Sequence, residues 1–161
     1  MDFLLQLLQV KTGGELSKFF NGNFFNPLKC VLIGARSIDY PGEFNNLKKA
    51  GIKVYSSEDI KNRGVEEVFQ EAMKIVTDGT EGFHLSIDTD VMDPEIAPGV
   101  SVPEINGISS KSFLKMIDCF MNYHEIIKSI DFVEYNPKFD EDNKTLEIIV
   151  KALEIIENNF K

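Results

Sequence analysis

The chain has 161 residues, of which 17 are Lys or Arg and 26 are Asp or Glu, so its formal net charge at pH 7 is −9. This acidic excess opposes binding to nucleic-acid phosphates and anionic lipids, and no apolar stretch reaches the roughly 18 residues that a membrane-spanning helix needs. We therefore expect a cytoplasmic protein that binds neither nucleic acid nor membranes. Two cysteines, Cys30 and Cys119, are too few for a disulfide scaffold and are expected to be reduced and buried.

The first part of the chain alternates strand-like runs with a helical segment. Residues 29–34 contain a continuous apolar run, which is typical of a strand buried on both faces. A helix is expected from Pro41, which suits a first helical turn, to Ala50, and Gly51 stands where a helix usually ends. Residues 52–55 predict a second strand directly after it.

A helix and a third strand are predicted in the middle of the chain. Apolar residues recur at helical spacing from Val65 to Val76, and Gly79 lies just beyond them. Residues 82–88 then predict a strand. A long irregular loop rich in Pro and Gly, residues 91–107, follows this strand at its carboxyl end, where open α/β sheets bind their ligands.

The last part of the chain adds two helices and a fourth strand, residues 127–135. Ser109 can N-cap a helix whose apolar stripe consists of Phe113, Met116, Ile117 and Phe120. A final helix from about Thr145 is expected to pack on the sheet through Leu146, Ile149, Val150 and Leu153. Because strands and helices alternate, the connections are crossovers, and the sequence predicts an α/β fold with a parallel sheet and helices on both faces.

Three aspartates lie where the third strand leaves the sheet: Asp88, Asp90 and Asp93. Strand alternation would place Asp88 and Asp90 on the same side, where two like charges in a partly buried cleft are costly unless a cation compensates them or one is protonated. Oxygen ligands favour Mg, Ca or Mn, and an added imidazole would favour Mn, Fe or Zn. Alternatively, the aspartates only cap the turn before Pro94. His84 lies about 13 Å back along an extended strand, so we expect a hydrogen-bonded core residue there.

The segment from Ser86 to Pro94, followed by residues 97–100, resembles the S-x-D-x-D-x-x-D-P signature of the ureohydrolase family, which comprises arginase, agmatinase, formimidoylglutamase and related enzymes. Residues 33–39 and 131–137 are similar to two further blocks of the family in order and spacing. The resemblance covers nearly the whole chain. It implies that residues 1–161 form a single partial domain, similar to the C-terminal half of the arginase-like three-layer fold, without the N-terminal metal-binding half.

The resemblance also implies a function. The family uses two manganese ions to activate water for attack on the carbon of a guanidino or formimidoyl substrate, which cleaves a C–N bond. By motif position, Asp88 and Asp90 resemble metal ligands, Glu134 resembles the carboxylate that pairs with the cationic end of the substrate, and Asp39 matches an arginase position that contacts its amino-acid end. The interval from Asp39 to Glu43 is one residue longer than in arginases, so the subfamily stays open.

The family's histidine-bearing metal blocks have no counterpart in this sequence, whose only histidines are His84 and His124. Two carboxylates from one loop cannot hold two manganese ions well, because a hard cation needs about six ligands. We therefore expect a ureohydrolase that is inactive without a missing N-terminal half. The alternative is a noncatalytic module that associates through an exposed sheet edge, as a homo-oligomer or with that half.

Overall fold

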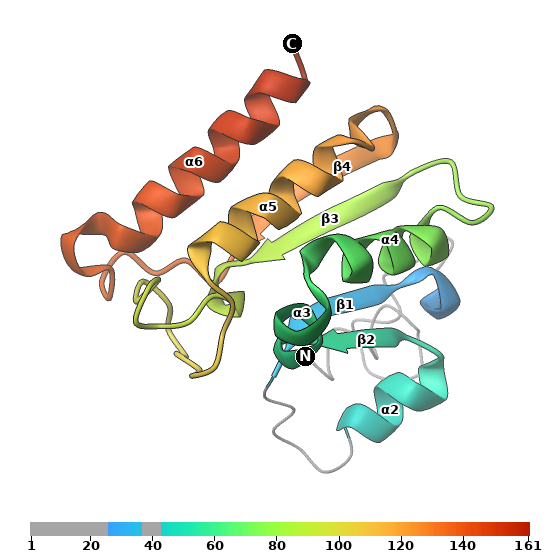
Figure 1. The fold of residues 1–161 in the computed structure, drawn as a ribbon, viewed down its shortest axis with the longest axis horizontal. Helices are drawn as coiled ribbons and strands as arrows, with labels where there is room; N and C mark the ends of the chain where they lie inside the picture. The colour runs from blue at the N-terminus through green and yellow to red at the C-terminus, as the bar shows by residue number, and fades with distance from the viewer. Residues whose placement is uncertain (1–25, 37–42) are drawn as a thin grey trace, which may run out of the picture.

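Four parallel strands organise the part of the chain that the computed structural model describes, residues 26–36 and 43–161. Strand β1 (Val31–Ala35) pairs with β2 (Lys53–Ser56), and β3 (Phe83–Asp88) pairs with β4 (Ile127–Val133). Both pairs are parallel, and in Figure 1 the arrows of β2 and β3 point toward the same side of the molecule. The predicted α/β class with parallel strands is confirmed, and the carboxyl ends of all four strands lie along one edge.

The helices between the strands are largely those that the sequence predicts. Figure 1 shows α4 and α5 in front of the strands and running roughly along them, with α6 beside α5. The helices are α2 (Glu43–Ala50), α3 (Ser57–Arg63), α4 (Val65–Val76), α5 (Ser110–Met121) and α6 (Lys144–Asn159). Short 3-10 turns are η2 (Pro27–Lys29), η3 (Thr89–Val91), η4 (His124–Ile126) and η5 (Glu141–Asn143).

Local signals fix several helix ends. Ser109 caps α5, because its Oγ accepts a hydrogen bond from the Ser112 N–H at 3.1 Å. Gly51 follows α2 with φ 79°, a left-handed conformation that suits glycine after a helix. Helix α3 was not predicted. It begins with a reciprocal capping box: Ser56 Oγ accepts from the Asp59 N–H at 3.0 Å, and Asp59 Oδ2 accepts from the Ser56 N–H at 2.7 Å.

The main core lies between the β3–β4 pair and helices α4 and α5. The inward side of β3 carries Phe83, Leu85 and Ile87, all buried. The predicted stripe of α5 is confirmed, since all four of its residues are buried. The rings of Phe69 on α4 and Phe120 on α5 meet edge to face with their centroids 4.9 Å apart, which joins the two helices above the sheet.

Helix α6 differs from the prediction in the face that it buries. Ile149 is buried as expected, but Leu146, Val150 and Leu153 are 38%, 43% and 47% exposed. The buried side of the helix consists of Thr145, Ile148, Ile149 and Ala152. The helix packs mainly against α5 and not on the sheet. Because apolar residues occur on more than one side of α6, its sequence pattern allows two faces, and contact with α5 selects between them.

The structure also bears on the expectations about membrane-spanning helices and about the cysteines. In residues 26–36 and 43–161, no helix is long and apolar enough to cross a membrane. Both cysteines are free thiols; Cys119 is buried and Cys30 is partly buried.

Candidate functional site

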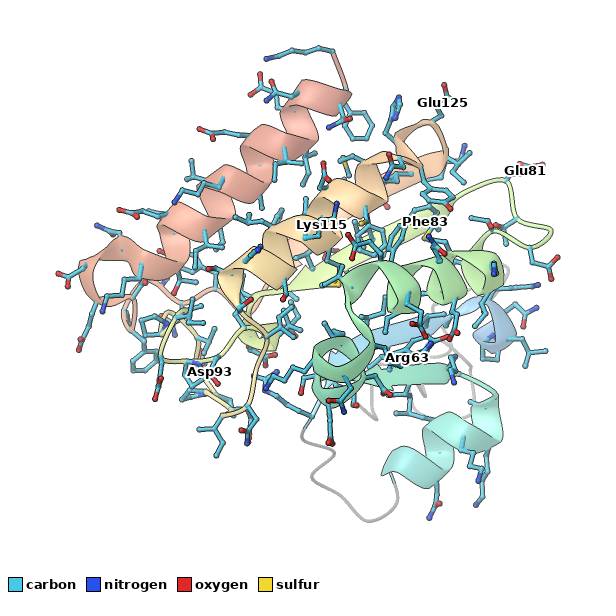
Figure 2. All side chains as sticks on the ribbon, viewed as in Figure 1. Arg63, Glu81, Phe83, Asp93, Lys115 and Glu125 are labelled. Carbon is cyan, nitrogen blue, oxygen red and sulfur yellow. The ribbon has the colours of Figure 1, made fainter. Side chains whose placement is uncertain are left out.

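The predicted site residues lie at the shared carboxyl edge of β3 and β4. Strand β3 ends at Asp88, and the parallel register pairs Asp88 with Val133, the last residue of β4. Glu134 follows immediately, so it stands at the same edge as Asp88, as expected for parallel neighbours. Figure 2 shows this direction along β3: Glu81 and Phe83 lie where the strand begins, and Asp93 lies in the loop beyond its carboxyl end.

A turn, and not strand alternation, brings Asp88 and Asp90 together. Turn η3 starts at Thr89, and Asp88 Oδ1 accepts a hydrogen bond from the Asp90 N–H at 3.0 Å. The premise that both aspartates continue one strand is therefore wrong, and the turn-capping role is present. Thr89 between them is fully buried.

The carboxyl group of Asp88 is in an unfavourable environment for its charge. Burial is the main cause that raises the pKa of Asp88 to about 7, and the negative charges of Asp90 and Glu134 raise it further, against the opposing effect of the Asp90 N–H. Three acidic side chains thus interact at one edge. Such an edge favours a cation, because a bound cation would stabilise the ionised carboxylates.

The donors at this edge are incomplete as a metal site. In the described part of the chain, no group of three or more His, Cys, Asp and Glu side chains is arranged to hold a metal ion. A hard divalent cation takes about six oxygen ligands. Asp88 and Asp90 therefore fit part of a donor set for such a cation, and the described residues do not complete it.

An arginine from the neighbouring strand pair contacts this edge. Arg36 directly follows β1, and its Nη2 donates hydrogen bonds to the main-chain oxygens of Asp90 and, at 3.0 Å, of Glu104. Arg36 lies inside the family-like block of residues 33–39 but was not predicted to have a role in the site. Its contact joins the β1–β2 pair to the turn that carries Asp90.

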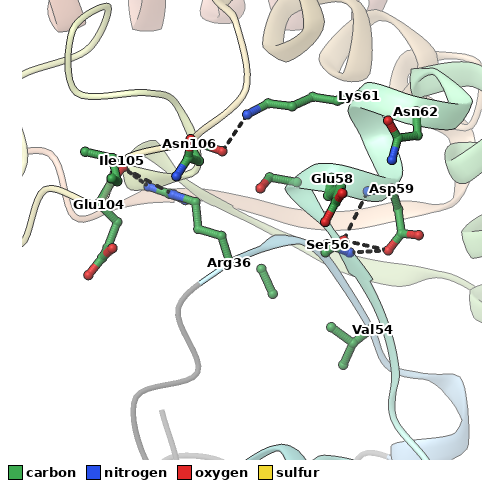
Figure 3. A pocket seen from close by; sticks show the side chains of 12 residues that line it. Arg36, Val54, Ser56, Glu58, Asp59, Lys61, Asn62, Glu104, Ile105 and Asn106 are labelled. Carbon is green, nitrogen blue, oxygen red and sulfur yellow. Dashed lines mark hydrogen bonds between the residues drawn. The ribbon is translucent and has the colours of Figure 1, made fainter.

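A pocket of about 830 Å³ opens beside this contact, at the carboxyl ends of β1 and β2. Figure 3 shows Arg36 and Lys61 reaching from its two sides to one loop, where Lys61 Nζ donates to the main-chain oxygen of Asn106 at 2.8 Å. Ser56 and Asp59 of the α3 capping box also line the pocket. The lining residues do not include the acidic side chains of the β3–β4 edge.

Two further residues were singled out in the sequence, Asp39 and His84. Asp39 lies outside the described residues. His84 is exposed, so the prediction of a core position is wrong, although its side chain is hydrogen-bonded: Nδ1 is 2.7 Å from Ser129 Oγ, and Nε2 is 3.2 Å from Asp131 Oδ2. Even-numbered side chains of β3 face away from the core, which explains this exposure.

Comparisons with known proteins agree on one family. The family model described as "Arginase family" matches residues 9–156. The arginase of Bacillus caldovelox is 38% identical over 127 residues, which are 79% of this chain and 42% of that protein. The arginase of Bacillus subtilis (strain 168) is 38% identical over 128 residues, 80% of this chain and 42% of that protein. This chain thus spans less than half the length of these relatives.

Solved structures show the same relationship. The Bacillus caldovelox arginase superposes with a TM-score of 0.83 at 32% identity, covering 92% of this chain and 50% of that chain. A formimidoylglutamase from Bacillus subtilis superposes with a TM-score of 0.75 over 81% of this chain and 40% of that chain; at 21% identity, this likeness shows the fold alone.

Proposed function

The chain belongs to the arginase family, and from this premise we propose that it forms part of the active site of a ureohydrolase, which cleaves a C–N bond of a guanidino or formimidoyl substrate. The observation that carries the proposal is the acidic edge at the ends of β3 and β4, where Asp88, Asp90 and Glu134 interact. Relatives of 38% identity described as arginases favour the guanidino substrate over the formimidoyl one.

Asp88 and Asp90 are proposed as ligands of manganese. Their support is the pairing of two carboxylates at a strand end, where burial and the negative charges of Asp90 and Glu134 oppose the ionisation of Asp88. Bound manganese would make water acidic enough to supply hydroxide near neutral pH. The remaining donors would come from outside the described residues, for which the unmatched portion of the arginases is the natural source.

Glu134 is proposed to bind and orient the cationic end of the substrate. A guanidinium or amidinium group presents planar N–H donors, which a carboxylate can receive in pairs. The Glu134 side chain is exposed at the same strand edge as Asp88, so a substrate bound to it would lie at the edge that carries the proposed metal ligands. Asp39 is proposed to contact the amino-acid end of that substrate.

The competing proposal is a noncatalytic module that associates through strand edges. It is favoured by the sheet topology: within residues 26–36 and 43–161, the strands form two separate two-stranded sheets, and such small sheets leave backbone donors and acceptors at their edges. A chain that associates in this way should give a mass above one protomer in light scattering at low micromolar concentration. A monodisperse monomer would contradict it.

The deciding experiment is a chimera that joins the amino-terminal part of the Bacillus caldovelox arginase to this chain. We expect it to release urea from arginine only with manganese, and to lose manganese when Asp88→Asn and Asp90→Asn are introduced together. Retention of the metal by this double variant would contradict the ligand assignment. A folded, manganese-loaded chimera without turnover would favour the noncatalytic module.

A further inference from the structure

Glu134 has an unusual backbone conformation. Its φ is 63°, in the left-handed region that residues with a side chain rarely adopt. Such a conformation persists only where the surrounding structure holds it, and it is enriched at functional sites. Glu134 is also the first residue beyond β4, where the strand ladder no longer fixes the backbone.

The peptide unit before Glu134 is held by Thr89. The Thr89 side chain is fully buried, and its Oγ donates a hydrogen bond to the main-chain oxygen of Val133 at 3.0 Å. That oxygen belongs to the same rigid peptide plane as the Glu134 N–H. Thr89 therefore links the turn between Asp88 and Asp90 directly to the backbone of Glu134.

The segment after Glu134 is held by a second set of contacts. Tyr135 forms an antiparallel bridge with Val100, and the Asn136 N–H donates to the Gly99 oxygen at 2.8 Å. The Asn136 Nδ2 donates to Ser101 Oγ at 2.9 Å. Glu134 thus stands between two anchored peptides, and its position depends on both.

We propose that Thr89 is a positioning residue, whose hydroxyl group holds the Val133–Glu134 peptide so that the Glu134 carboxylate faces a planar cation at the Asp88–Asp90 edge. The identity of the bound cation rests on the proposed function. The positioning itself is a property of this chain and can be tested without turnover. Because threonine and valine have nearly the same shape, Thr89→Val removes the donor and little else.

The first test measures amide hydrogen exchange by NMR in the full 161-residue chain. With Thr89→Val, we expect exchange at the Asn136 amide, which bonds to Gly99, to accelerate about tenfold or more, whereas Thr89→Ser, which keeps the hydroxyl, should change it less than about threefold. The matched control is Thr77→Val, which removes a similar bond from Thr77 Oγ1 to the Met73 oxygen at the end of α4, 2.7 Å long. This control should leave the exchange rate of the Asn136 amide unchanged.

Three outcomes of this test would overturn the proposal. Unchanged exchange at Asn136 in Thr89→Val would show that the hydroxyl does not hold the segment. Equal acceleration in Thr77→Val would show a general loss of stability. Thr89→Ala, which also lacks the hydroxyl, carries the test if Thr89→Val does not fold; failure of both to fold would assign Thr89 to folding and not to local positioning.

The second test uses the chimera and separates positioning from structure. Thr89→Val should raise KM for arginine about tenfold or more at unchanged manganese content, while Thr77→Val leaves KM unchanged. Loss of manganese in Thr89→Val would place its effect on the metal loop and overturn the proposal. If the unsubstituted chimera shows no turnover, the proposed function fails, and the exchange measurement still decides the role of Thr89.

Discussion

The guanidinium group of Arg36, at the end of β1, donates a hydrogen bond to the main-chain oxygen of Asp90, in the turn that follows β3. The two residues are 54 positions apart in the sequence. Because β1 and β3 share no strand ladder among the described residues, this contact and the packing around it connect the two strand pairs. It also supports the turn that carries the proposed metal ligands.

We expect Arg36→Ala to lower the free energy of unfolding by about 1–3 kcal/mol, because two partly buried carbonyl oxygens would lose their charged donor. Arg36→Lys should recover only part of this, since an ammonium group lacks the planar fork of a guanidinium. Urea unfolding followed by circular dichroism measures both. The control is Lys61→Ala, whose bond to Asn106 is exposed and whose loss should cost less than about 1 kcal/mol. Equal effects at the two positions would contradict this ranking.

Helix α6 provides a test of which apolar face matters. Ile149→Ala should destabilise the chain by about 2–4 kcal/mol, because Ile149 is 7% exposed. Leu153→Ala, at a position that is 47% exposed, should cost less than about 1 kcal/mol. Thermal and urea unfolding of the pair compare them directly. A larger cost at Leu153 would mean that the helix buries its other face, against α5 or another chain.

The same helix shows how far the sequence can specify the fold. Where apolar residues occupy one stripe, as in α4 and α5, both the helix and its buried face follow from spacing. Where they occupy several sides, as in α6, the helix is predicted but its face depends on the neighbouring helix. Helix α3 was missed because only Ser57 and Ile60 are buried, so no apolar period exists, and its signal is the capping box at Ser56.

The residues of the candidate site were likewise only partly predictable from the sequence. The short segment around Asp88 and Asp90, with Glu134, is recognisable from its pattern, because these residues lie in motifs contiguous in sequence. Thr89 and Arg36 were not assigned roles, because their partners, Val133 and Asp90, lie 44 and 54 residues away and are brought near only by the folded chain. Their hydrogen bonds are accepted by main-chain oxygens. Every residue type has such an oxygen, so the sequence does not indicate which one accepts.

The hydrogen bonds of the Asp140 carboxylate predict that the stability of the chain depends on pH in the acidic range. Its carboxylate accepts hydrogen bonds from the Thr145 N–H at 2.8 Å and the Leu146 N–H at 2.9 Å, at the start of α6. Burial alone would raise the pKa of Asp140, but these donors outweigh it and lower the pKa below its ordinary value of 3.8. A lowered folded-state pKa means that the stabilisation is present above pH 3.8 and is lost as the pH falls through the lower folded value.

We therefore expect Asp140→Asn to lower the free energy of unfolding at pH 7 by about 1 kcal/mol and to reduce the loss of stability below pH 4. Urea unfolding from pH 3 to pH 7 measures both effects. Asp118→Asn, at an exposed position on α5, is the control and should change little. An unchanged acid profile for Asp140→Asn would show that the carboxylate does not stabilise the folded chain.

Glu134→Gln tests the proposed substrate contact. In the chimera we expect kcat/KM for arginine to fall more than about tenfold at unchanged manganese content, because a neutral amide cannot pair with a guanidinium as a carboxylate does. The control is Glu125→Gln in η4, just before the opposite end of β4, which Figure 2 shows far from Asp93. Unchanged kinetics for Glu134→Gln would make Glu134 an ordinary strand-end carboxylate, and equal losses in both variants would indicate a general defect.

The isolated 161-residue chain should be silent toward arginine, agmatine and formimidoylglutamate, because Asp88 and Asp90 provide only part of a metal site within the described residues. Manganese should then raise the melting temperature by less than about 2 °C at 1 mM, since stabilisation by a ligand grows only as RT ln(1 + [L]/Kd) and the Kd of such a site is high. Calorimetry with manganese, and an assay of urea or ammonia release, measure these expectations. Asp88→Asn with Asp90→Asn should abolish whatever shift remains. A large shift together with robust turnover by this chain alone would show that it completes the site with its own residues.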